Sequence, residues 1–75
     1  MATAFILINA ETGEENIVLE KLKVVPEVKE VYMVYGVYDI IARVETGTMQ
    51  ELKDILSLKI RRLDKVSSTL TMVVI

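Results

Sequence analysis

The order of strand-like and helix-like segments restricts the fold of this 75-residue chain more than any other feature. Runs of β-branched and other apolar residues predict strands, and apolar residues at steps of three and four predict helices. The strands are expected over residues 3–10, 28–35, 38–45 and 66–75, and the helices within 11–26 and 48–63. The predicted order is therefore β-α-β-β-α-β.

Both predicted helices carry start signals. Thr12 with Glu15, and Thr48 with Glu51, have the spacing of a capping box, in which a hydroxyl and a carboxylate satisfy free amides at the helix start. Pro26 is expected to end the first helix, because the residue before a proline resists the α-helical conformation.

A glycine separates the second and third predicted strands. Gly36-Val37 fits a two-residue type II′ hairpin turn. With right-handed crossovers, the element order then predicts one ferredoxin-like α+β domain over residues 1–75. Its four-stranded antiparallel sheet has both helices on one face, with the first and third strands central and the second and fourth at the edges.

Both faces of this predicted sheet carry large apolar side chains. In the first strand Phe5 and Leu7 alternate with Ile6 and Ile8, and the third and fourth strands repeat the pattern. Each large apolar side chain left in water forfeits about 1.5–3 kcal/mol relative to burial. The pattern therefore predicts a homodimer in which two sheets pack face to face.

The composition excludes several classes of function. Cysteine and histidine are both absent, which removes disulfides, the common transition-metal sites and histidine-based catalysis. We expect no enzyme activity, no metal and no cofactor. The net charge of −2 argues against direct nucleic-acid binding, and no segment predicts a membrane span or signal peptide, so a cytoplasmic protein is expected.

The segment around the predicted hairpin contains the strongest candidate for a functional residue. Asp39 follows the turn and precedes a central strand, between Tyr38 and Ile40. It either accepts hydrogen bonds from turn amides or binds a cation such as an amino-acid ammonium group. Tyr35 and Tyr38 beside it are either walls of a binding site or packing residues.

Two other stretches allow a functional interpretation beside a structural one. The basic run 59–62 fits a nucleic-acid contact, but cations are also favoured near a helix C-terminus, and the acidic whole favours that interpretation. The hydroxyl-rich run 67–71 is either a half-exposed strand or a row of donors for a ligand carboxylate, and the first is the commoner case.

The chain resembles the RAM domain, the effector-binding half of Lrp/AsnC transcription regulators. The resemblance rests on the element order, on "YGVYD" followed by "IIARV", and on the closing "VSSTLTMVVI". Full-length members carry an N-terminal helix-turn-helix domain. Because Met1 is followed directly by the first strand, the resemblance predicts a stand-alone effector-binding domain without a DNA-binding domain.

The resemblance also implies a ligand and an assembly. It implies sheet-to-sheet dimers assembled into octamers or decamers, hetero-association with full-length Lrp/AsnC regulators, and an amino-acid effector bound near the hairpin. The implied ligand-binding residues are Tyr35, Gly36, Val37, Tyr38, Asp39, Ser68, Thr69 and Thr71. The expected function is non-catalytic amino-acid sensing that modulates such regulators or amino-acid metabolism; the alternative is a structural oligomerisation subunit without a ligand.

Overall fold

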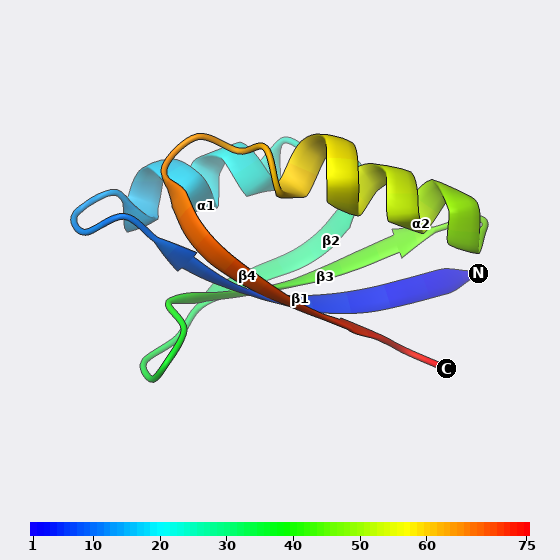
Figure 1. The fold of residues 1–75 in the computed structure, drawn as a ribbon, viewed down its shortest axis with the longest axis horizontal. Coiled ribbons are helices and arrows are strands. Elements are labelled where there is room, and N and C mark those ends of the chain that lie inside the picture. The colour runs from blue at the N-terminus through cyan, green and yellow to red at the C-terminus, as the bar shows by residue number, and fades with distance from the viewer.

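The computed structural model describes all 75 residues and has the ferredoxin-like α+β fold predicted from the element order. The strands are β1 (Ala2–Ala10), β2 (Val28–Met33), β3 (Ile40–Thr46) and β4 (Val66–Val73). The helices are α1 (Glu15–Lys23) and α2 (Met49–Ile55), and α2 continues into a π-helical segment, Leu56–Ile60. The antiparallel sheet has the order β2-β3-β1-β4, with both helices on one face (Figure 1).

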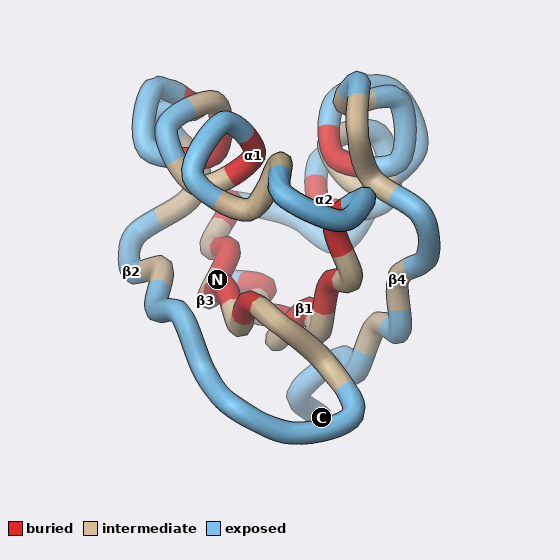
Figure 2. Tube along the Cα trace, turned by 90° about the vertical axis from the view of Figure 1, so that its left-hand side faces the viewer, coloured by how far each residue is buried: buried red, intermediate tan, exposed pale blue.

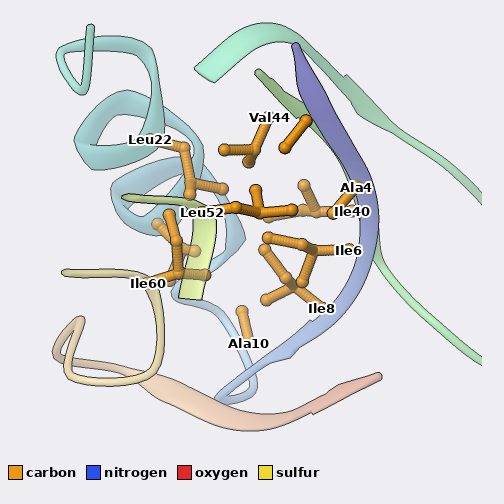
Figure 3. Close-up of a cluster of buried hydrophobic side chains, with 11 residues drawn as sticks. Ala4, Ile6, Ile8, Ala10, Leu22, Ile40, Val44, Leu52 and Ile60 are labelled. Carbon is orange, nitrogen blue, oxygen red and sulfur yellow. The ribbon is translucent and has the colours of Figure 1, made fainter. Parts of the chain in front are cut away.

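The core lies between the helices and the two central strands. Even-numbered residues of β1 and β3 point toward the helices, where Ile6, Ile8 and Ile40 are fully buried. Leu22 from α1 and Leu52 from α2 meet them (Figure 3). Burial of each such side chain contributes about 1.5–3 kcal/mol, so this layer holds the helices on the sheet.

The opposite face of the sheet has no helix over it (Figure 2). Leu7 pairs with Ile41 of β3 on one side and with Leu70 of β4 on the other, and all three point away from the helices. Leu70 and Met72 are 45% and 47% exposed. The prediction that both faces of the sheet are apolar is confirmed.

One of the two predicted threonine caps forms. Thr48 Oγ1 accepts a hydrogen bond from the Glu51 amide at 3.1 Å, so Thr48 caps α2. The prediction that Thr12 caps α1 is wrong. The first helical residue is Glu15, preceded by a turn with Gly13 at φ +83°, so Thr12 lies too far from the amides it would cap.

The second helical region ends earlier than its apolar pattern predicted. The Arg61 amide donates to the Leu56 carbonyl at 3.0 Å, a five-residue step that makes a wide π-type turn. Ile60, at the end of this turn, is 1% exposed and belongs to the core. Neither helix is long and apolar enough to cross a membrane.

The connection between β2 and β3 differs most from the expectation. A two-residue turn at Gly36-Val37 is wrong, because the Val34 amide pairs with the Asp39 carbonyl at 2.8 Å and leaves four residues between them. Val34 and Asp39 are therefore the pair that closes the hairpin. The Asp39 amide also donates to the Ile8 carbonyl at 3.0 Å, which holds this end of the hairpin on β1. The resulting loop extends on the side of the sheet away from the helices (Figures 1 and 2).

Candidate functional site

Asp39 directly precedes β3 and is fixed by contacts from β1 and from Val34, the residue just after β2. Besides its two backbone bonds to Ile8 and Val34, its Oδ2 atom accepts a hydrogen bond from the Ala10 amide at 3.1 Å. The donor is therefore an amide of β1 and not an amide of the turn. Asp39 is half-buried, and Oδ1 accepts no hydrogen bond from the chain. One carboxylate oxygen thus orients the side chain while the other is free.

The loop beside Asp39 presents unpaired donors. The backbone amides of residues 35–38 donate to no acceptor within the chain. Gly36 has φ +151°, which other residues rarely adopt, although a side chain there would meet no atom within 4 Å. The glycine is therefore needed for the backbone conformation of the loop and not to avoid a steric clash. An anionic group such as a carboxylate is a suitable acceptor for the unpaired amides of this loop.

A shallow apolar hollow of about 170 Å³ lies at the base of the same loop. It is lined by Met33, Val34 and Tyr35. Tyr35 is fully exposed and Val37 is 85% exposed, whereas Tyr38 is half-buried. Of the sequence-predicted residues, Tyr35 lines the hollow; Gly36, Val37, Tyr38 and Asp39 lie along the loop beside it.

The structure does not bring the β4 hydroxyls to Asp39 within one chain, because β1 lies between β3 and β4. The β4 hydroxyls also lie on different faces of the sheet, because successive side chains of a strand point to opposite faces. Ser68 pairs with Asn9 on the open face and accepts a hydrogen bond from its Nδ2 atom at 3.2 Å. Thr69 and Thr71 pair with inward-pointing residues of β1 and lie on the helix side of the sheet.

The open face also carries a charged network that the sequence analysis did not identify. Arg43 Nε donates to Glu30 Oε1 at 2.5 Å and its Nη1 donates to Glu45. The Tyr32 hydroxyl donates to Glu30 Oε2 at 2.9 Å. The bond from Arg43 lowers the pKa of Glu30, and the bond to Glu30 raises the pKa of Tyr32 and of Arg43. The network links edge strand β2 to β3.

A second hollow, of about 220 Å³, lies at the other end of the sheet. It is lined by Met1, Lys29, Glu45, Thr46 and Gly47 and contains none of the predicted site residues. No cluster of three or more histidine, cysteine or acidic side chains is placed to hold a metal ion.

Sequence reasoning missed three contributors to the loop site. Met33 and Val34 line the hollow, and the signal for them was an apolar run directly before the glycine. Ala10 orients Asp39 through its backbone amide, 29 positions away along the chain. No sequence pattern marks such a contact, because every non-proline residue carries the same amide.

Comparison with known proteins supports the resemblance over the whole chain. A family model described as the Lrp/AsnC ligand binding domain matches residues 3–75. The HTH-type transcriptional regulator FL11 of Pyrococcus furiosus is 36% identical over 72 residues, which are 96% of this chain and 47% of FL11. The chain spans about half the length of the curated relatives it matches.

Solved structures agree in fold. FFRP-DM1 is 48% identical, with a TM-score of 0.96 and full coverage of both chains. AsnC of E. coli is 31% identical, with a TM-score of 0.90, over 97% of this chain and 50% of that one. FL11 is an HTH-type transcriptional regulator, and AsnC of Haemophilus influenzae is a regulatory protein. From the family match, the identities and the coverage, the chain belongs to the Lrp/AsnC ligand-binding domain family.

Proposed function

We propose that this chain is a non-catalytic effector-binding module that holds a free α-amino acid beside the β2–β3 loop. The observation that carries the proposal is the half-buried Asp39 carboxylate, with one oxygen oriented by Ala10 and the other free, next to a loop with unpaired amides. Membership in a ligand-binding domain family of transcriptional regulators supports a regulatory role.

The groups at this loop match the two charges of an amino acid. The free oxygen of Asp39 accepts hydrogen bonds from the ligand ammonium, and the amides of residues 35–38 donate to the ligand carboxylate. Charge-assisted hydrogen bonds of this kind are roughly twice as strong as neutral ones. Exclusion of water from the loop strengthens both contacts.

The proposal includes an assembly. Covering the open face of one sheet with that of a second copy removes Leu7, Ile41 and Leu70 from water. Such dimers then associate further, as octamers or decamers, and pair with full-length Lrp/AsnC regulators through the same face. The hydroxyls of Ser68, Thr69 and Thr71, which lie away from Asp39 in one chain, contribute to a ligand site from a neighbouring copy. A ligand bound between copies stabilises the assembly that contains it.

Isothermal titration calorimetry against the common L-amino acids tests the proposal directly. Asp39→Asn is the matched variant, because an amide oxygen can still accept the hydrogen bond from Ala10 while the negative charge is removed. We expect the unmodified protein to bind at least one amino acid, and Asp39→Asn to lose that binding while its assembly is retained. Absence of heat at millimolar ligand, for every amino acid, would overturn the proposal.

One observation favours a second candidate, a structural oligomerisation subunit without a small-molecule ligand. The bond between Asp39 and Ala10 gives this carboxylate a role in holding the hairpin on β1 whether or not a ligand binds. Under this candidate function, Asp39→Asn leaves the protein unchanged or alters its assembly, and no amino acid changes the sedimentation of the unmodified protein.

A further inference from the structure

We infer that the chain carries a second surface for contact with copies of itself, made of two loops of opposite charge. The acidic loop is residues 11–15, from the end of β1 to the first residue of α1. The basic loop is residues 61–65, between the π-helical segment and β4. This surface is separate from the open sheet face and requires no ligand, so the inference goes beyond the proposed function.

The two loops lie side by side although they are far apart in the sequence. The Glu11 amide donates to the Lys65 carbonyl at 2.8 Å, and both loops lie at the end of the molecule where β1 leads into α1 (Figure 1). Lys65 has φ +71°, a conformation that residues other than glycine seldom adopt. The bond to Glu11 ties the basic loop to the end of β1. A tied arrangement reduces the entropy that a contact between copies costs.

The charged side chains of these two loops form no ion pair within the chain. The carboxylates of the acidic loop are Glu11, Glu14 and Glu15, and the cations of the basic loop are Arg61, Arg62 and Lys65. The four ion pairs of the chain all lie elsewhere. Within the basic run 59–62, Lys59 alone is paired, with Glu27 at 3.6 Å. The other charges are exposed or half-buried, and they are therefore available to another molecule.

Helix dipoles account for only part of this distribution of charge. A carboxylate is favoured at the first turn of a helix and a cation at the last turn, and the effect falls off within that turn. Glu15 and Arg61 fit this explanation, because they lie at the start of α1 and at the end of the π-helical segment. Glu11 precedes the helix, and Arg62 and Lys65 lie beyond the π-helical segment. These three charges need another explanation.

Adjacent loops of opposite charge are self-complementary across a two-fold axis. When two copies face each other at this end, the acidic loop of each meets the basic loop of the other, and symmetry makes the same contact twice. The contact pairs charges that one chain leaves unpaired. An isolated exposed ion pair contributes little, so the contact depends on several charges acting together. The net charge of −2 gives only weak repulsion between whole copies.

Salt distinguishes this surface from the open sheet face. The distance over which charges interact falls from about 10 Å at about 0.1 M salt to about 3 Å at about 1 M. Burial of apolar surface does not depend on such screening. Sedimentation velocity of the unmodified protein is expected to show a larger species at about 0.1 M sodium chloride, with at least about a tenfold higher dissociation constant at about 1 M.

Two charge-reversal variants test which loops meet. Arg61→Glu with Arg62→Glu makes both loops acidic, and Glu11→Lys with Glu14→Lys makes both loops basic. Each variant alone is expected to lose the larger species at about 0.1 M salt, because loops of like charge then face each other. An equimolar mixture of the two variants is expected to recover it, because an acidic end then meets a basic end.

Lys21→Glu with Lys53→Glu is the matched control for the first variant. It changes the net charge by the same amount, and both lysines lie in helices outside the two loops. Neither lysine takes part in an ion pair. The control is expected to keep the larger species. Circular dichroism shows whether each variant is folded.

The inference is overturned if the unmodified protein sediments identically at both salt concentrations. It is also overturned if the control loses the larger species, because net charge and not the two loops would then be responsible. A mixture of folded variants that does not recover the larger species would show that the loops do not contact each other. If a variant does not fold, the salt dependence of the unmodified protein decides. Amino-acid binding is tested separately by calorimetry, so failure here leaves the proposed function intact.

Discussion

Arg43 and Glu30 join β3 to edge strand β2, with 2.5 Å between Nε and Oε1, on the sheet face that the helices leave open. Arg43 is also paired with Glu45, and its side chain is 27% exposed. The guanidinium thus holds carboxylates from two strands on the open face. An arginine is suited to this position because its fixed fork of donors can bind two acceptors at once.

The network predicts a pH dependence of stability. Arg43 and then Tyr32, by their hydrogen bonds, hold the pKa of Glu30 below its usual value of 4.5. The folded state therefore favours the charged form, so this contribution is fully present above pH 4.5 and is lost as the pH falls through the lowered pKa. We expect Glu30→Gln to remove this part of the acid destabilisation, as measured by urea unfolding at a series of pH values.

Glu20→Gln is the control for that experiment. Glu20 pairs with Lys23 on the exposed surface of α1 at 3.3 Å, and its side chain is 71% exposed. Exposed pairs of this kind contribute about 0–1 kcal/mol, so Glu20→Gln is expected to follow the unmodified protein. An acid-unfolding profile for Glu30→Gln that matches the unmodified protein would contradict the predicted role of the network.

The two threonines with capping-box spacing predict unequal effects on stability. Thr48→Ala removes the acceptor of the Glu51 amide and is expected to lower the free energy of unfolding by about 1 kcal/mol. Thr12→Ala removes no helix cap and is expected to change it by less than about 0.5 kcal/mol. Chemical denaturation of both variants measures the difference, and equal losses would contradict it.

Replacement of Asp39 separates its structural role from its charge. Asp39→Ala leaves the Ala10 amide without its acceptor and is expected to cost about 1–3 kcal/mol of unfolding free energy. Asp39→Asn keeps an acceptor oxygen and is expected to retain most of that stability. Hydrogen exchange of the Ala10 amide, followed by NMR, should be faster in the alanine variant than in the asparagine variant. Equal exchange rates would show that the side chain does not hold β1.

The open sheet face predicts how the protein assembles. Leu70→Lys places a charge on this face in edge strand β4, beside Leu7, where Leu70 is 45% exposed, and is expected to shift sedimentation toward the monomer. Leu58→Lys is the matched control, because Leu58 is 59% exposed in the helical layer. It should sediment like the unmodified protein. A Leu70→Lys protein that still sediments as the same oligomer would show that copies do not meet through this face.

The ferredoxin-like fold was predictable from local pattern. Ile6 lies in an alternating strand pattern and Leu52 in a helical pattern, and both are buried. Each pattern depends only on which face of one element is buried, so it can be read from residues that are neighbours in the sequence. The loop between β2 and β3 was not predictable in the same way. Gly36-Val37 had the local chemistry of a tight turn, but β1 holds Asp39 by both its amide and its carboxylate. These distant contacts outweigh the local preference.

The amino-acid sequence by itself determined the order of elements, the two apolar faces of the sheet and the presence of one carboxylate beside a glycine loop. Only the tertiary structure decided where that carboxylate points, that Met33 and Val34 form a hollow, and that Ser68 and Thr69 lie on opposite faces of the sheet. The physical reason is the sequence separation of the residues that interact. Periodicity and composition act between neighbours in the chain, whereas the site depends on how β1 aligns with β3 and β4, which lie far from it in sequence.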